Sequence, residues 1–294
     1  MVRISIIGSG VVGKATGQGF RKCGIQSIFC DIDRMKLEGI KAEGCEATQN
    51  VEEAVKASEI SFICVQTPTF KERIDLSHIR KATEQVGKAL REKDDYHLVA
   101  IRSTVLPTTT RRKIIPILER YSGLKASKDF GVCYNPEFMR EATALEDFLN
   151  PWRIVIGQLD QRSGDELEEL YSTFNAPKIR ASLEEAEMIK YVSNMFLTTK
   201  ISFFNEIFAI CKKLRLDPNL IAEATALDPR IGKYGIYGGR PFRGRCLPKD
   251  LEAFVSFIKD MKLNPKILDS ALSINRRLCR AEEIRSRKAP RTRP

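Results

Sequence analysis

The turn at residues 8–13 constrains the fold of this chain more than any other stretch. An apolar, β-branched run at 2–7 leads into Gly8-x-Gly10-x-x-Gly13, and a helical pattern follows. In such a unit the first glycine permits the tight turn, the second lets the backbone approach a pyrophosphate, and the third lets the helix pack on the strand. The helix N-terminus attracts the phosphates. The pattern therefore predicts a parallel α/β sheet that binds a dinucleotide at this turn.

A carboxylate follows at the distance that such a unit requires. The second strand pattern, SIFCD, ends in Asp31. A carboxylate at this point can accept both ribose hydroxyl protons and would repel a 2′-phosphate, which favours NAD over NADP. The alternative, a glycine-rich turn without a ligand, does not explain why the strand, the helix and Asp31 occur together. We therefore expect NAD as the cofactor.

Strand and helix patterns continue to alternate through the first half of the chain. We expect strands at 60–65, 98–102 and 130–134, and helices at about 77–91 and 108–119. This alternation predicts a doubly wound parallel sheet, a Rossmann domain, with its ligand beyond the carboxyl ends of the strands. Two motifs fall there, VQTPT (65–69) and RSTVLPTTT (102–110). Each offers hydroxyl groups, although plain turn chemistry remains the alternative interpretation.

The second half of the chain places polar groups in apolar surroundings. Residues 134–157 read as a polar loop that ends in a strand; its Glu137 and Glu141 share one face if the stretch is helical. Residues 184–214 read as one long, largely buried helix, in which Lys190 and Asn194 lie one turn apart. Polar groups in an apolar helix are costly unless they find partners. The pair therefore indicates either a buried network or a site.

The eight cysteines form no CxxC pair, so neither a zinc site nor a redox motif is indicated, and we expect no metal. No signal peptide or bilayer-length apolar run is evident, which suggests reduced thiols in the cytoplasm and no membrane partner. Cys64 is typical of the core cysteines. Cys246 differs, because RCLPKD places Arg245 and Lys249 close to it, and cations stabilise a thiolate. On these six residues alone, a surface turn that happens to contain a cysteine is the favoured interpretation.

The net charge of +11 does not indicate a nucleic-acid partner. Residues 276–294 hold eight basic and two acidic residues, which supply +6 of that charge. A basic run of this kind is more often solvated than bound to a specific polyanion. With 43% apolar and 30% charged residues, the remainder is typical of a globular protein.

Taken together, the motifs resemble the UDP-glucose/GDP-mannose dehydrogenase family, closest to its UDP-glucose 6-dehydrogenase branch. The resemblance rests, in family order, on GSGVVG, Asp31, VQTPT, STVLP, NPEF-x-x-E, Lys190-x-x-x-Asn194, LDPRIG (227–232) and CLPKD. It implies that the 6-hydroxyl of a nucleotide sugar is oxidised to a carboxylate by two hydride transfers to NAD. In between, Cys246 captures the aldehyde as a thiohemiacetal and then carries a thioester.

The resemblance also implies roles for individual residues. Lys190 and Asn194 match oxyanion-stabilising positions, Glu137 the candidate base, and Thr104 and Asp250 the residues that hold the hydrolytic water. The matched cofactor positions are Gly8, Gly10, Val11, Val12, Gly13, Asp31, Lys36, Thr67, Thr104, Glu141 and Lys249. The matched substrate positions are Glu137, Glu141, Lys190, Asn194, Arg230, Arg243 and Gly244. Arg230 matches an arginine that reaches the neighbouring subunit, which implies a homodimer built on the middle helices.

The expected organisation is an NAD-binding Rossmann domain at 1–182, a helical central domain with the cysteine loop at 183–288, and a basic tail at 289–294. The family's nucleotide-binding domain would follow, so we expect a fragment, a paralogue, or a split-gene product with a separate nucleotide-binding partner. The cysteine loop reads PFRGRC where the family usually has GFGGSC, so Pro241, Arg243 and Arg245 replace small residues. Trp152 replaces a usual acidic residue.

Two other functions remain open at this point. One is a two-electron β-hydroxyacid dehydrogenase, which shares the lysine on the long helix and needs no cysteine. The other is an NAD-binding scaffold without catalysis. Four-electron turnover, a single hydride per substrate, or NAD binding alone would distinguish the three.

Overall fold

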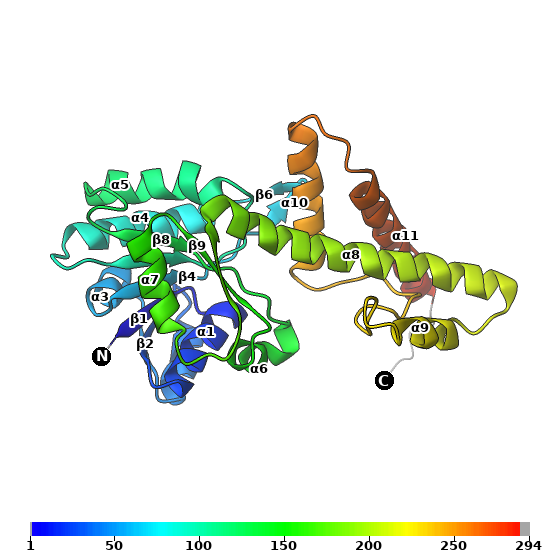
Figure 1. Cartoon of the computed structure of the whole chain (residues 1–294), viewed down its shortest axis with the longest axis horizontal. Coiled ribbons are helices and arrows are strands. Elements are labelled where there is room, and N and C mark those ends of the chain that lie inside the picture. The colour runs from blue at the N-terminus through cyan, green and yellow to red at the C-terminus, as the bar shows by residue number, and fades with distance from the viewer. Residues whose placement is uncertain (1, 289–294) are drawn as a thin grey trace. The chain divides into compact units, whose positions relative to one another are not determined.

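The computed structural model describes residues 2–288; the predicted basic tail at 289–294 lies outside the described residues. The chain forms two compact units. Unit 1 comprises Met1–Pro68 and Ile74–Lys190, and unit 2 comprises Thr69–Arg73 and Tyr191–Pro294. In Figure 1 the α/β unit is coloured blue to green, and the helices of unit 2 are coloured from yellow-green to red. Among the described residues, no helix has both the length and the apolar character to cross a membrane.

An eight-stranded sheet forms the centre of unit 1, in the order β10-β9-β8-β7-β4-β1-β2-β3. The strands are β1 (Arg3–Ile7), β2 (Gln26–Cys30), β3 (Glu46–Thr48), β4 (Ile60–Ile63), β7 (Leu98–Ile101), β8 (Gly131–Tyr134), β9 (Ile154–Gln158) and β10 (Lys178–Ser182). All neighbours pair in parallel except β8 and β9, which are antiparallel. The predicted doubly wound sheet is confirmed, with this one antiparallel pair. The strand order reverses between β1 and β4, where such sheets bind ligands.

Helices cover both faces of the sheet, and this explains why the central strands β4, β7 and β8 are buried along their whole length. They are α1 (Val11–Lys22), α2 (Arg34–Ala42), α3 (Val51–Lys56), α4 (Ser77–Arg91), α5 (Ile115–Ser122), α6 (Ala144–Leu149) and α7 (Gln161–Leu170). Alternate side chains of a strand point to opposite faces. Ile6 accordingly packs in a cluster with residues of α1, α6 and α7, and Ile7 in a cluster with residues of α3, α4 and α5.

Unit 2 is built mainly from helices. They are α8 (Leu183–Leu214), whose residues from Tyr191 onward belong to this unit, α9 (Pro218–Ala226), α10 (Leu247–Asp260) and α11 (Lys266–Lys288). The hairpin β5 (Thr69–Phe70) and β6 (Arg73–Ile74) supplies the remaining segment. Arg73 holds it to α10 by donating two hydrogen bonds to Asp260, at 2.9 and 3.1 Å. The sequence did not indicate this attachment.

Candidate active site

The predicted site residues of unit 1 lie at one edge of the sheet. Gly8 follows β1, Asp31 follows β2, Thr67 follows β4, Thr104 follows β7 and Glu137 follows β8. These five strands are consecutive in the sheet and mutually parallel. Their carboxyl ends therefore meet at the same edge, as the sequence predicted.

The glycine turn leaves room for a phosphate group. Gly8 has φ +101°, and a Cβ atom on Gly13 would lie only 1.9 Å from the Gly8 carbonyl oxygen. By contrast, a Cβ atom on Gly10 would meet nothing within 4 Å. Gly10 is the N-cap of α1, and no side chain caps that helix. The first turn of α1, which includes Val11 and Val12, thus presents its amino end beside open space, which fits a pyrophosphate.

Asp31 connects the end of β2 to this turn. Its carboxylate accepts hydrogen bonds from the backbone N–H groups of Ser9 (2.7 Å) and Asp33 (3.0 Å). The ammonium group of Lys36, on α2, lies 3.7 Å from the same carboxylate. Asp31 therefore lies next to the glycine turn, where a ribose bonded to the phosphates would be. These residues fit an NAD molecule.

The two hydroxyl-bearing motifs meet each other. The Thr67 hydroxyl donates to the Thr104 carbonyl oxygen at 2.7 Å, and the Ser103 hydroxyl donates to the Val65 carbonyl oxygen at 2.7 Å. The loops after β4 and β7 are thus held together beside the strand-order reversal. Ordinary turn hydrogen bonds form within a single loop, whereas these two hydrogen bonds link separate loops. Plain turn chemistry therefore does not account for them.

Glu137 and Lys190 form a buried ion pair. The Lys190 Nζ lies 2.9 Å from Glu137 Oε1 and also donates to the Glu137 carbonyl oxygen. Glu137 Oε2 accepts from the Met139 N–H at 2.7 Å. Burial alone would raise the pKa of Glu137, but the charge and hydrogen bond of Lys190 outweigh it, so the pKa is lowered. The carboxylate is therefore ionised in the folded protein.

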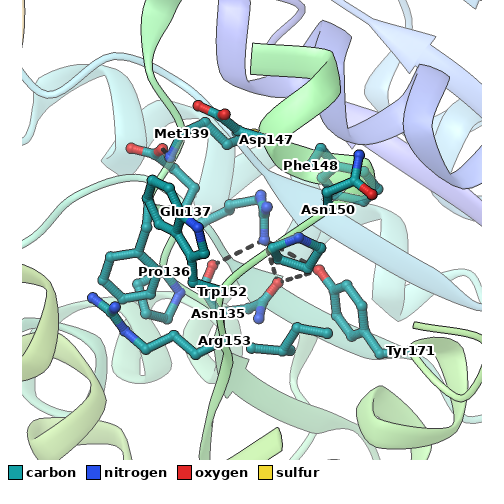
Figure 2. Close-up of a pocket in the computed structure, with 14 residues that line it drawn as sticks. Asn135, Pro136, Glu137, Met139, Asp147, Phe148, Asn150, Trp152, Arg153 and Tyr171 are labelled. Carbon is teal, nitrogen blue, oxygen red and sulfur yellow. Dashed lines mark hydrogen bonds between the residues drawn. The ribbon is translucent and has the colours of Figure 1, made fainter. Parts of the chain in front are cut away.

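Buried polar residues surround the turn that carries Glu137. Asn135, Glu137 and Tyr171 line a cavity together with Arg102 and Trp152, and Figure 2 shows how Tyr171 and Asn135 point toward each other. Residues 135–140 are not helical, and Glu141 begins the short 3-10 turn η2 (Glu141–Thr143). The condition under which Glu137 and Glu141 would share a helical face is therefore not met. Proline at 136 and the side-chain bonds of Asn135 favour an irregular turn instead.

In unit 2 the predicted residues form a second polar cluster. Asp250 is 1% exposed, accepts a hydrogen bond from the Asn194 amide (2.7 Å), and pairs with the Lys249 ammonium group (2.5 Å). Cys246 is the N-cap residue of α10, and its carbonyl oxygen accepts the Asp250 N–H at 3.0 Å. The buried-network interpretation of Asn194 therefore holds, and its partners are themselves predicted site residues.

Cys246 differs from the core cysteines in exposure. Burial raises the pKa of both Cys30 and Cys64 to about 12, which makes these thiols unreactive. Cys246 is exposed and lies at the amino end of α10, where a helix favours negative charge. Among these three thiols, Cys246 is the one suited to act as a nucleophile.

The three remaining predicted substrate residues lie in unit 2. Arg230 is 88% exposed at its side chain and pairs with Asp228 at 2.6 Å. Arg243 pairs with Glu282 on α11 at 2.6 Å. Gly244 has φ +89°, a conformation that suits glycine. Both guanidinium groups therefore already have a carboxylate partner within unit 2.

The sequence did not single out Arg102, Tyr171 or Glu187. Arg102 directly follows the buried strand β7, and a charged residue at the ligand edge of a sheet was a signal for it. Glu187 is buried on α8 and accepts a hydrogen bond from the Thr110 N–H at 2.8 Å. Burial raises the pKa of Glu187 to about 7. The position of Glu187 within an apolar helix was a comparable sequence signal for a functional residue.

Comparison with known proteins places these features in one family. The NAD binding domain of the UDP-glucose/GDP-mannose dehydrogenase family matches residues 41–175, and the central domain of that family matches residues 184–277. GDP-mannose 6-dehydrogenase of Azotobacter vinelandii is 40% identical over 86% of this chain and 63% of its own length. The Pseudomonas putida enzyme of the same name is 37% identical over 93% of this chain and 68% of its own length.

A solved structure agrees with the fold along almost the whole chain. The UDP-glucose dehydrogenase from the hyperthermophilic archaeon Pyrobaculum islandicum is 35% identical, with a TM-score of 0.91 over 98% of this chain and 71% of that one. This chain therefore spans about two thirds of the length of these relatives.

Proposed function

The chain belongs to the UDP-glucose/GDP-mannose dehydrogenase family, and from this premise we propose that it acts as an NAD-dependent nucleotide-sugar 6-dehydrogenase. The observation that carries the proposal is the cluster around Cys246 in unit 2. An exposed thiol at a helix N-terminus precedes a buried Asp250 that Asn194 and Lys249 hold in place. A two-electron dehydrogenase does not require such a thiol for its reaction.

The residues at the carboxyl edge of the sheet would hold NAD. The amino end of α1 with Gly10 would receive the pyrophosphate, and Asp31 would accept the ribose hydroxyl protons. The same carboxylate would repel a 2′-phosphate, so we expect NAD to bind more tightly than NADP. When bound, NAD supplies the hydride acceptor for the oxidation.

The chain's own residues would divide the remaining chemistry. The Cys246 thiolate would add to the aldehyde carbon to give a thiohemiacetal, and Lys190 and Asn194 would stabilise the negative charge on its oxygen. Loss of a second hydride from this carbon to NAD would convert the thiohemiacetal into a thioester. Lys190 uses two of its three N–H groups on Glu137, which leaves one for a substrate oxygen. Glu137 is ionised and can take a proton from the water that cleaves the thioester, which releases the carboxylate and the thiol.

The sugar is proposed more finely as UDP-glucose or a close analogue, from the sequence motifs and the Pyrobaculum structure. GDP-mannose is the other candidate, and sequence identity favours it, because the two GDP-mannose 6-dehydrogenases are 40% and 37% identical and the Pyrobaculum enzyme is 35% identical. An assay of NADH formed per sugar consumed, run with and without a candidate nucleotide-binding partner, distinguishes both from the alternatives. Two NADH per sugar supports the proposal, one supports a two-electron dehydrogenase, and none with NAD bound supports a scaffold.

The Cys246→Ser variant tests the covalent step. We expect it to retain NAD affinity but lose acid formation, because an alkoxide forms far less readily than a thiolate near neutral pH. Cys23→Ser is the matched control, since Cys23 is partly exposed at the end of α1 in unit 1 and is not a member of the cluster. Full acid formation by Cys246→Ser would remove the covalent mechanism.

We also propose a homodimer that forms through α8, with a nucleotide-binding region supplied by a longer form of the chain or by a separate partner. The dimer is supported by an exposed apolar stripe along α8, formed by Val192, Phe196, Phe203, Ile210 and Leu214. The nucleotide-binding partner is supported by the greater length of the relatives.

A further inference from the structure

Arg102 is a buried cation that none of the proposed chemical steps uses. It directly follows β7 and is 6% exposed. Its Nη1 donates to the Asn135 carbonyl oxygen (3.3 Å), to the Asn135 side-chain oxygen and to the Tyr171 hydroxyl (3.2 Å). Within the described part of the chain none of its hydrogen-bond partners is a carboxylate, and its buried Nε has no partner. Its guanidinium carbon lies 5.5 Å from the centre of the Phe148 ring. Burying a cation without a carboxylate partner costs free energy, so we expect Arg102 to have a function that offsets this cost.

Asn135 is the residue on which these contacts converge. Its backbone N–H donates to the Ile101 carbonyl oxygen at 2.8 Å, and its side-chain amide donates to the Val155 carbonyl oxygen at 2.9 Å. Its side-chain oxygen accepts the Tyr171 hydroxyl at 2.7 Å, the contact drawn between these two residues in Figure 2. Every polar group of Asn135 is thereby occupied by a neighbouring strand, by Arg102 or by Tyr171.

Asn135 begins the turn that carries Glu137. Only Pro136 separates the anchored Asn135 from Glu137, the carboxylate that pairs with Lys190. If the Arg102 contacts were lost, the carbonyl and side-chain oxygens of Asn135 would lose a charge-assisted donor in a buried setting. The turn would then be free to shift, and Glu137 would lose its alignment with Lys190.

We propose that Arg102 is a positioning residue of the candidate site, which anchors Asn135 and so orients the Glu137 carboxylate toward Lys190. The inference rests on the proposed function, in which Glu137 takes a proton from the water that cleaves the thioester. A second contribution comes from its charge, because Arg102 adds to the attraction that keeps Glu137 ionised. Tyr171 supports the same anchor from α7 through its hydroxyl group.

The test compares Arg102→Met, which removes both fork and charge, with Arg102→Lys, which keeps the charge but loses the planar fork. Tyr171→Phe removes one donor to Asn135. Arg180→Met is the matched control, because Arg180 pairs with Asp165 and Glu168 on α7 and contacts no site residue. All variants are first checked for folding by thermal denaturation and for NAD affinity.

Two readouts are measured: the Glu137 titration by carbon-13 NMR, and kcat and KM for NADH formation with the remaining third of a relative supplied as a separate chain. For Arg102→Met we expect the Glu137 midpoint to rise and kcat to fall on the order of a hundredfold with KM for NAD unchanged, the size of effect typical of a misplaced group. Arg102→Lys should keep the midpoint near that of the parent but still lower kcat. Arg180→Met should change neither.

A folded Arg102→Met with the parental Glu137 titration and the parental kcat would overturn the proposal. If Arg102→Met fails to fold, the same decision rests on Arg102→Lys and Tyr171→Phe. If the parent chain gives no turnover with any nucleotide sugar even when the remaining third of a relative is supplied as a separate chain, the proposed function fails. The NMR titration still decides whether Arg102 orients Glu137.

Discussion

At the scale of single residues, the Glu137–Lys190 pair is the contact whose loss should matter most for folding. Both side chains are buried. We expect Lys190→Met to lower the free energy of unfolding by about 3–5 kcal/mol, because it leaves a carboxylate buried without its cation. The double variant Lys190→Met/Glu137→Gln should be less destabilised, since it leaves no buried charge. Urea denaturation of the three proteins measures this.

An exposed ion pair provides the control for this prediction. Lys56 and Glu52 on α3 lie 2.7 Å apart with both side chains largely exposed. Lys56→Met should change the free energy of unfolding far less than Lys190→Met, because solvent screens an exposed ion pair. A Lys190→Met variant that is no less stable than Lys56→Met would contradict the role given to burial.

His97 makes the stability of the fold depend on pH. It is buried, and its Nε2 lies 2.8 Å from the hydroxyl of Ser61 in the sheet. Burial, and secondly the charge of Lys93, lowers the pKa of His97 to about 3. Below pH ~6.5 the unfolded chain binds a proton that the folded chain does not, so stability falls as the pH drops toward 3. The expected slope from this residue is at most about 1.4 kcal/mol per pH unit.

Urea midpoints between pH 7 and pH 4 measure this slope. His97→Gln should flatten the dependence, because a side chain that does not titrate removes the proton difference. His78→Gln is the control, since His78 is exposed at the start of α4 and should leave the slope unchanged. Equal slopes for the parent and His97→Gln would show that other groups cause the acid sensitivity.

At the scale of elements, α8 carries an exposed apolar stripe. Its members are Val192, Phe196, Phe203, Ile210 and Leu214, all exposed. Their spacing of four and seven residues places them on one face of the helix. A contiguous stripe of this kind marks a protein interface, and a second copy of the same helix would present the same surface.

We expect Phe196→Glu to weaken the proposed dimer about thirtyfold or more, the effect of losing a 2 kcal/mol anchor. Sedimentation velocity over a range of concentrations measures the change. Phe70→Glu is the matched control, because Phe70 is 68% exposed, close to the 65% of Phe196, but lies on the hairpin rather than on the stripe. A parent chain that stays monomeric at all concentrations would refute the dimer.

The elements also show what a sequence can and cannot predict. The helix at 77–91 and the long helix near 184–214 were confirmed almost to the residue, since regular apolar spacing reports a buried face directly. The hairpin at 69–74 was missed. Its turn residues, Lys71 and Glu72, have positive φ without the glycine or asparagine that usually marks such a turn.

The candidate site divides in the same way. The glycine turn and Asp31 were predictable because their geometry is set within one strand–turn–helix unit. The anchor of Asn135 was not, because Arg102, Asn135 and Tyr171 are separated by 33 and 36 residues and meet only in the folded sheet. The pairing of Lys190 with Glu137 was not predicted either, since 53 residues separate them.

At the scale of the whole molecule, the chain matches about two thirds of the length of its relatives. The glycine turn and Asp31, which would hold NAD, are complete within unit 1. The proposed nucleotide sugar would need further contacts, because binding energy remote from the reacting carbon positions that carbon for reaction. The cysteine loop would contribute little to holding the nucleotide, since its Arg243 is already paired with Glu282.

We therefore expect a polypeptide limited to these 294 residues to bind NAD, and more tightly than NADP, but to form NADH from UDP-glucose or GDP-mannose only at a trace rate. Calorimetric titration measures the first part, and NADH absorbance with each sugar measures the second. Asp31→Ala should abolish the preference for NAD, which shows that the binding occurs at the predicted turn. Adding the remaining third of a relative as a separate chain should raise the rate if that region grips the nucleotide. Steady turnover by the 294 residues alone would contradict this and would require the cysteine loop to hold the diphosphate, with Arg243 released from Glu282.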